Sequence, residues 1–190
     1  MICEVYDDKF DKEYLYQLYM LMETNLKWHA NNVANASTLP FGRRGTHKLF
    51  GSNVFQRSGL NKIDYCDNEN FGSFYSLFQY CCQICNINPE SVLLSRMCAN
   101  LQHNGCQGTL HTDGSSKEKT IMVFPNPEWK PEWEGKFQVF SEDKTELLEE
   151  HEYVPGRIIL FPSHLPHRGL APVGDYLYRY SIVFGIACQT

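Results

Sequence analysis

Apolar residues change their spacing near Ser91, and the change divides the sequence into a helical part and a strand part. Before it, apolar side chains recur at helical spacing in two stretches, Asp11 to Trp28 and Phe71 to Cys85. After it, apolar and polar residues alternate in short runs separated by Pro, Gly and Asn, which is typical of antiparallel strands. Helices followed by many short strands predict an α+β fold, with a jelly-roll core and N-terminal supporting helices.

One predicted strand, from Leu94 to Gln102, has two different faces. Its apolar face carries Met97, Ala99 and Leu101, and its polar face carries Arg96, Cys98, Asn100 and Gln102. The polar face either meets solvent or lines a pocket, where Asn100 and Gln102 would bind a ligand. Further strands are predicted near residues 120–125, 136–140, 157–161 and 176–185.

The length of 190 residues and the hydrophobic content of 43% suit one domain with a core. We expect that domain to span residues 1–190, with helical support and loops in residues 1–90 and the jelly roll in residues 91–187. No apolar run approaches the roughly 18 residues of a membrane span, and the first residues lack a secretion signal. We therefore expect a soluble, cytoplasmic protein without a membrane partner. A net charge of −5 argues against a broad nucleic-acid surface.

Eight cysteines raise the question of a disulfide or zinc site. One C-x-x-C is present, from Cys82 to Cys85, and no second pair accompanies it. Because this pair falls in an apolar helical stretch, we interpret the cysteines as small core residues of a reduced protein.

The most informative chemical pattern is His111-Thr112-Asp113. If His111 and Asp113 share an extended strand, as we expect, residues two apart point to the same face, so the imidazole and the carboxylate can meet one metal ion. His167 follows a buried strand predicted from Val154 to Phe161 and is well placed to add a third ligand. His164 is the alternative, and we favour His167. Two histidines and one carboxylate leave open positions on the metal, as in non-haem Fe(II) oxygenases.

A second pattern lies in the last predicted strand, where Arg179 and Ser181 point to the same side of an apolar, aromatic run. A buried arginine is costly unless it meets an anion. Its guanidinium fork suits a carboxylate, and the serine hydroxyl adds a donor.

The residues from about Ser91 to Phe184 resemble the Fe(II)- and 2-oxoglutarate-dependent dioxygenases, in particular the prolyl-hydroxylase-like branch and its phage-encoded relatives. The shared motifs are H-x-D at His111 and Asp113, a distal His at His167, and R-x-S at Arg179 and Ser181. The resemblance implies a double-stranded β-helix in which the first three residues bind iron and the last two bind 2-oxoglutarate.

The resemblance also extends to the surroundings of these motifs. It adds Phe124 and Phe137, together with Asn100, to the residues expected around 2-oxoglutarate. Two positions differ from the family pattern, because Phe124 stands where many prolyl hydroxylases have a Tyr and Glu134 replaces the first Gly of a common pair. The implied cofactors are Fe(II), 2-oxoglutarate and O2, with ascorbate as a candidate accessory reductant.

The implied activity is hydroxylation of a C–H bond in a prolyl residue or a proline-like substrate, with release of succinate and CO2. The expected partner is therefore a protein, a peptide or a small molecule, and the oligomeric state is left open. Two alternatives remain, a non-catalytic jelly roll that binds a metal or a carboxylate, and a dioxygenase acting on another small molecule or a nucleobase.

Such an enzyme must exclude water from its site, so the polar, glycine-containing stretches Asn31 to Arg57 and Asp64 to Asn70 are predicted to form a lid. Arg43 or Arg44 would then contact the substrate. The competing interpretation of this stretch is an exposed polar loop.

Overall fold

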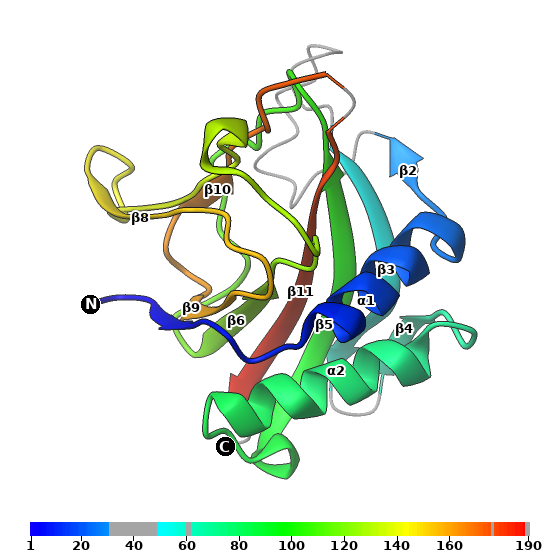
Figure 1. Ribbon diagram of the computed structural model, residues 1–190. Coiled ribbons are helices and arrows are strands. Elements are labelled where there is room, and N and C mark those ends of the chain that lie inside the picture. The colour runs from blue at the N-terminus through cyan, green and yellow to red at the C-terminus, as the bar shows by residue number, and fades with distance from the viewer. Residues whose placement is uncertain (31–48, 60–61, 176, 189–190) are drawn as a thin grey trace.

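The computed structural model describes residues 1–30, 49–59, 62–175 and 177–188. In these residues eight strands pair in one antiparallel sheet, in the order β1-β9-β6-β11-β5-β3-β2, with β4 paired to β3 (Figure 1). The strands of this large sheet are β1 Glu4–Tyr6, β2 His29–Ala30, β3 Phe50–Gly59, β4 Lys62–Cys66, β5 Val92–Gln102, β6 Glu118–Val123, β9 Ile158–Pro162 and β11 Arg179–Cys188.

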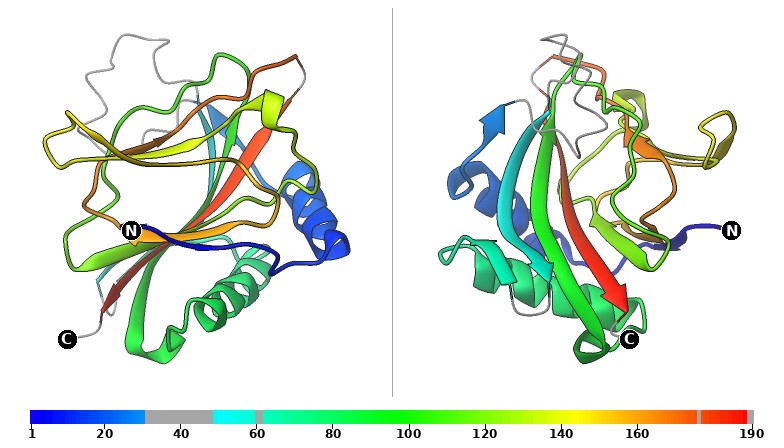
Figure 2. Two further views of the ribbon diagram at one scale, coloured as in Figure 1. Left: turned by 60° about the vertical axis from the view of Figure 1, so that its left-hand side comes forward. Right: turned by 180° about the vertical axis from the view of Figure 1, so that it is seen from behind.

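A second, smaller sheet has the order β10-β7-β8. Its strands are β7 Phe137–Phe140, β8 Leu147–His151 and β10 His167–Gly169. Side chains of β7 pack with side chains of β5, β6, β9 and β11 in one apolar cluster, so the two sheets face each other (Figure 2). This arrangement confirms the predicted α+β fold with a two-sheet core.

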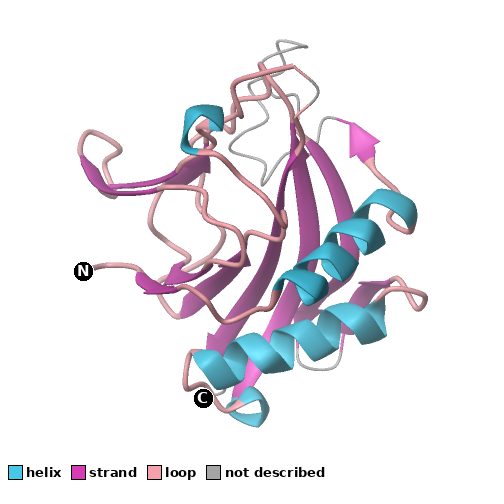
Figure 3. Ribbon diagram, in the orientation of Figure 1, coloured by secondary structure: helices cyan, strands magenta, loops and turns pink. Residues whose placement is uncertain are grey.

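Two helices, α1 Lys12–Thr24 and α2 Phe71–Ile84, cover the outer face of the large sheet (Figure 3). Asp11 caps α1 by accepting a hydrogen bond of 2.7 Å from the backbone N–H of Tyr14. The predicted helix over Asp11 to Trp28 is therefore correct in place but ends earlier, whereas α2 matches its prediction within one residue. The residues that the structure describes also contain two short 3-10 helices, η2 Pro89–Ser91 and η3 Pro131–Trp133.

Alternation along β5 and β11 separates the two sides of the large sheet. Met97 and Ala99 on β5 and Tyr180, Ile182 and Phe184 on β11 pack toward the helices. The other face of these strands lines a cavity between the sheets, with Arg96, Cys98, Asn100 and Gln102 from β5 and Arg179, Ser181 and Val183 from β11. The polar face of β5 thus lines a pocket, which decides between the two interpretations of the sequence.

The predicted lid over Asn31 to Arg57 is wrong for its last part, because residues 50–59 form β3 inside the large sheet. Val54 and Phe55 are buried in the core beneath the helices. The second lid segment, Asp64 to Asn70, is also wrong, since it continues β4 and then turns into α2. Burial of the apolar pair Val54 and Phe55 holds this segment in the sheet, although the residues around the pair are polar. Residues 31–48, including Arg43 and Arg44, lie outside the described part of the chain.

The described cysteines form no disulfide, and most are buried. Cys81, Cys82 and Cys85 pack into the core between α2 and the sheet. Burial raises the pKa of Cys82 to about 12, so its thiol stays protonated and behaves as a small apolar group. The interpretation of the C-x-x-C as core is confirmed.

Neither helix of the described chain combines the length and the apolar character needed to cross a membrane.

Candidate metal centre

His111, Asp113 and His167 converge at one point of the cavity between the sheets. Their candidate ligand atoms all lie within 4.8 Å of one another. Nε2 of His111 is 3.6 Å from one oxygen of Asp113, and Nε2 of His167 is 3.5 Å from the other. The three residues that the sequence singled out are therefore brought together.

Backbone hydrogen bonds explain why these distant segments meet. The N–H of His111 donates to the carbonyl of His167 at 3.1 Å, and the N–H of His167 donates back at 2.8 Å. The N–H of Asp113 donates to the carbonyl of Ser163 at 2.9 Å. The prediction that His111 and Asp113 share a regular strand is wrong, because only His111 forms a bridge and Asp113 is tied to the β9–β10 connection instead.

The hydrogen bond made by Nδ1 of each histidine ring determines where that ring carries its proton. Nδ1 of His111 lies 2.7 Å from the carbonyl of Thr109, and Nδ1 of His167 lies 2.9 Å from the carbonyl of Leu165. A carbonyl only accepts, so Nδ1 carries a proton, and in the neutral ring Nε2 presents a lone pair toward Asp113. Two lone pairs and a carboxylate repel each other unless a cation lies between them. The donor set therefore fits a metal ion, with carbonyl oxygens orienting both rings.

Asp113 stays ionised in this setting. Burial alone would raise the pKa of Asp113, but the positive charge of Arg96 holds that pKa well below its usual value. Nη2 of Arg96 lies 2.9 Å from one carboxylate oxygen, and Oγ1 of Thr120 donates to the other at 3.1 Å. Thr120 also shares a hydrogen bond of 2.8 Å with Ser163. No sequence pattern points to Thr120 or Ser163, and Arg96 stands out only as a member of the polar face of β5.

His164, the alternative third ligand, lies outside this group. Its Nε2 is 3.5 Å from a carboxylate oxygen of Glu142, on the connection after β7. The choice of His167 over His164 is consistent with this geometry.

A buried guanidinium occupies another part of the same cavity. Arg179 is 2% exposed, its Nε donates to the carbonyl of Gly135 at 2.7 Å, and its Nη1 donates to Oε1 of Gln102 at 2.8 Å. In the described part of the chain, Nη2 has no hydrogen-bond partner. Burial lowers the pKa of Arg179 to about 10, because nothing in the described chain forms an ion pair with it. An unpaired, buried donor that borders a cavity is a ready site for a carboxylate.

The cavity has a volume of about 280 Å³ and is bordered by both the three metal-ligand candidates and Arg179. Asn100, Phe137 and Ser181 also line it. Gln102 lines it too, but its amide N–H groups donate to the carbonyls of Cys106 and Gly169. Gln102 is therefore fully engaged in holding the guanidinium, which differs from its expected role as a ligand-binding residue.

The sequence matches no protein-family model and no curated protein. The structure, in contrast, matches solved structures over the whole chain. An oxidoreductase of the 2OG-Fe(II) oxygenase family from Burkholderia pseudomallei superposes with a TM-score of 0.66 at 11% identity, covering 100% of this chain and 86% of that one. A prolyl-4-hydroxylase from Pseudomonas putida gives 0.61 at 13% identity, with 100% and 94% covered.

The non-heme alpha-ketoglutarate-dependent epimerase SnoN of nogalamycin biosynthesis gives 0.62 at 11% identity, covering 100% of this chain and 78% of that one. The chain has the fold of the 2OG-Fe(II) oxygenases. The three proteins carry different activities in their names, so the shared fold does not identify a substrate.

Within the 2OG-Fe(II) oxygenase fold, the two departures from the family pattern are placed around Arg179. Phe124 does not line the cavity; its ring centre lies 5.1 Å below the guanidinium carbon, and the ring stacks on Tyr153. The Tyr153 hydroxyl donates to the carbonyl of Tyr180, so it does not replace the missing family tyrosine. Phe124 can therefore affect a bound anion only through Arg179.

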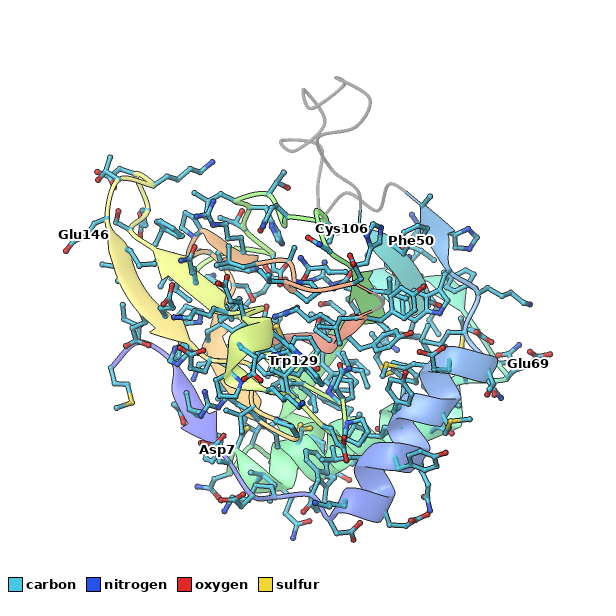
Figure 4. The ribbon with its side chains drawn as sticks, turned by 45° about the horizontal axis from the view of Figure 1, so that its top comes forward. Asp7, Phe50, Glu69, Cys106, Trp129 and Glu146 are labelled. Atoms are coloured by element: carbon cyan, nitrogen blue, oxygen red, sulfur yellow. The ribbon has the colours of Figure 1, made fainter. Side chains whose placement is uncertain are left out.

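Glu134 adopts a φ of 52°, a conformation that favours glycine, which accounts for the glycine in the family pattern. The next residue, Gly135, has a φ of 78°. A Cβ added there would lie 3.1 Å from Cδ of Arg179 and 3.1 Å from the ring of Trp129, the residue labelled in Figure 4. A glycine at 135 therefore leaves the room that the arginine needs.

A second group of candidate ligands, Cys3, Glu149 and His151, lies outside the cavity, with Glu149 and His151 on β8. The Glu149 carboxylate already accepts hydrogen bonds from the backbone N–H groups of Ile2 and Cys3. Burial and Glu149 raise the pKa of Cys3, so the thiol stays protonated beside the Glu149 carboxylate. We interpret this group as the anchor of the N-terminal residues.

Proposed function

We propose that the protein is an Fe(II)- and 2-oxoglutarate-dependent dioxygenase that hydroxylates a C–H bond of a prolyl residue or a proline-like substrate, releasing succinate and CO2. One observation carries the proposal. A set of two histidines and an aspartate shares a small cavity with a buried arginine that has an unpaired donor.

His111, Asp113 and His167 would hold the iron. Two imidazole nitrogens and one carboxylate oxygen are the ligand set of non-haem Fe(II) oxygenases, and they leave coordination positions for other ligands. When bound, iron and 2-oxoglutarate supply the oxidising chemistry, so the chain's own residues need only bind, orient and exclude water.

Arg179 would hold the remote carboxylate of 2-oxoglutarate. Its Nη2 is the unpaired donor, and Gln102 and Gly135 fix the plane of the guanidinium before any ligand arrives. Ser181, two residues along β11, lines the same cavity and offers a hydroxyl. Asn100 and Phe137 border the space that the co-substrate would fill. Preorganised donors of this kind reduce the entropic cost of binding.

The choice of prolyl or proline-like substrates is supported by the motif set H-x-D, distal His and R-x-S and by the fold shared with a prolyl-4-hydroxylase. Other small molecules and nucleobases belong to the same proposal as alternatives for the substrate. A non-catalytic metal- or carboxylate-binding role is the alternative for the whole protein, and it predicts binding without turnover.

The test is succinate formation by the purified protein with Fe(II), 2-oxoglutarate, O2 and a panel of free proline, prolyl peptides and nucleosides, with and without ascorbate. We expect substrate-stimulated succinate and a hydroxylated product with at least one proline-containing compound. Arg168→Gln is a matched control, because Arg168 lies on β10 and bonds Gln138 outside the cavity. Binding of metal and 2-oxoglutarate without any succinate would favour the non-catalytic alternative.

A further inference from the structure

Arg96 is a second arginine in the cavity, and the proposed binding of 2-oxoglutarate does not use it. It lies on the same face of β5 as Gln102, the residue paired with Arg179 in the register of β5 and β11. Six residues along a strand separate their Cα positions by about 20 Å. Arg179, paired with Gln102, therefore lies at the other end of this polar face from Arg96, and Arg96 is the arginine that contacts the metal-ligand candidate Asp113.

The charges that line the cavity leave one positive charge unmatched. Among the described lining residues, only Arg96, Asp113 and Arg179 carry a permanent charge. A divalent metal ion and two arginines exceed the charge of Asp113 and of the 2-oxoglutarate dianion by one. A buried excess charge is costly, so a ligand with one negative charge would complete the site.

Arg96 is able to reach such a ligand. Its side chain is 22% exposed, whereas that of Asp113 is 7% exposed. In the described chain it has a single ion-pair partner, one oxygen of Asp113, and a guanidinium has five N–H donors. The fork can thus hold Asp113 and a second carboxylate together.

A polar neighbour lies next to Arg96 on the adjacent strand. Gln56 of β3 is opposite Arg96 in the strand register, and both line the cavity. Nδ2 of Asn53 lies 3.3 Å from Oε1 of Gln56. Because its carbonyl oxygen accepts that bond, the Gln56 amide can serve as a donor toward the cavity.

We propose that Arg96, assisted by Gln56, binds a carboxylate of the substrate, so that the substrate is a small monocarboxylate such as a free amino acid of the proline type. This inference rests on the proposed dioxygenase function and specifies its substrate class. A prolyl residue inside a peptide chain has no carboxylate to offer at this position. A peptide that ends in proline presents the same chemistry, and the test separates the two sources.

The competing role for Arg96 is that of a counter-ion that only holds Asp113. In that role Arg96 would affect metal binding, and the affinity for the substrate would not depend on the charge of the substrate. The two roles are therefore separated by comparing a free acid with its neutral carboxamide.

The experiment measures calorimetric binding to the protein loaded with Mn(II) and 2-oxoglutarate in the absence of oxygen. The ligands are free L-amino acids including L-proline, each paired with its carboxamide, a capped tripeptide with internal proline and a peptide ending in proline. We expect at least one free acid to bind about tenfold or more tightly than its carboxamide, as for loss of a charge-assisted contact. Arg96→Gln should abolish this difference, and Arg168→Gln should preserve it.

Arg96→Lys provides a second variant if Arg96→Gln fails to fold, because lysine keeps a charge beside Asp113 but loses the fork. We expect it to weaken the free acid severalfold and to leave the carboxamide unchanged. The proposal is overturned if no free acid exceeds its carboxamide, if the internal prolyl peptide binds best, or if Arg96→Gln and Arg96→Lys both keep the preference. Tight binding of the peptide ending in proline, with no free acid bound, would assign the carboxylate to a peptide terminus and overturn the free-amino-acid class. Failure of 2-oxoglutarate to bind in the first loading step would instead count against the dioxygenase function.

Discussion

Two backbone carbonyls, of Thr109 and Leu165, decide what the histidines of the site can do. Each accepts from Nδ1 of a ring and so turns the lone pair of Nε2 inward, toward Asp113. The distances of 3.5 and 3.6 Å between Nε2 and carboxylate oxygens exceed the roughly 2.7–2.9 Å of a charge-assisted hydrogen bond. This spacing is better explained by a site for a cation than by histidine–aspartate ion pairs.

Replacing His111 by alanine should remove metal binding while the apo fold persists, because the ring contributes to the site and not to the two apolar clusters. His164→Ala is the matched control, since it deletes a neighbouring imidazole outside the group of three. Titration of each variant with Fe(II) under anaerobic conditions is the measurement. Equal metal affinity in His111→Ala and His164→Ala would contradict the assignment.

Replacing Arg179 by glutamine should weaken 2-oxoglutarate binding by at least about tenfold, because a charge-assisted bond to an ionised group contributes roughly 1.5–3 kcal/mol. Arg168→Gln removes a comparable charge from β10, where the side chain bonds Gln138. Isothermal titration with 2-oxoglutarate compares the two. A shift of similar size in both variants would point to a general effect of charge and not to a specific anion site.

The residues of the site differ in how far the sequence can reveal them. His111, Asp113, His167 and Arg179 stand out because a fixed spacing, or a charge in an apolar strand, signals their chemistry. Thr120 has no such signal, since its role depends on a strand pairing that brings it to Asp113. Arg96 was visible only as part of an alternating face.

Among the elements, strand β3 differs most from the prediction, which placed most of its residues in a lid. Its residues look turn-rich, yet β3 pairs with β5 from Phe50 to Gln56 and places Asn53 and Gln56 at the cavity. By contrast α2 was predicted almost to the residue, because a helix depends on local periodicity whereas a strand depends on a distant partner.

A stability measurement distinguishes a lid from a strand at residues 50–57. Phe55 is 3% exposed and packs against Phe71 of α2, so Phe55→Ala should cost about 3–5 kcal/mol of unfolding free energy. Tyr65→Ala on the paired strand β4 is the control, because Tyr65 is 47% exposed and should change stability little. Urea denaturation of the two variants gives the comparison. Wild-type stability of Phe55→Ala would restore the lid interpretation.

The segment after β1 is tied to the sheet by an ion pair between Asp7, labelled in Figure 4, and Arg157, with a distance of 2.7 Å. The hydrogen bonds that Arg157 donates to the Asp7 carboxylate lower the pKa of Asp7 in the folded protein. A lowered folded-state pKa means that the pair stabilises the fold above the unfolded pKa of about 3.9 and loses this contribution as the pH falls through the folded value.

Asp7→Asn should therefore destabilise the protein at neutral pH by at most about 1 kcal/mol, since the carboxylate is partly exposed. The difference from wild type should vanish in acid, below the folded pKa of Asp7. Asp8→Asn is the control, because Asp8 is exposed and asparagine tolerates its φ of 57°. Thermal unfolding from pH 7 down to about pH 2 is the measurement. A difference of the same size at every pH would show that the ion pair is not its cause.

For the whole molecule, the order of elements in the sequence was enough to predict the class of fold, because helices that precede many short strands leave few compact arrangements. The pairing of β7, β8 and β10 into a separate small sheet could not be predicted, since it depends on which edges the long strands leave open. That small sheet, with the large one, encloses the cavity. The expectation of one domain over residues 1–190 stays a prediction.

The central claim is that one cavity binds both a metal ion and 2-oxoglutarate, and reciprocal binding tests it most directly. Affinity for 2-oxoglutarate is measured by anaerobic calorimetry with and without Mn(II), and affinity for Mn(II) with and without 2-oxoglutarate. A cation and a dianion in one low-dielectric cavity should each raise the affinity for the other by the same factor, and His111→Ala should abolish the coupling. The account would be contradicted if neither ligand changed the affinity for the other, or if the coupling persisted in His111→Ala.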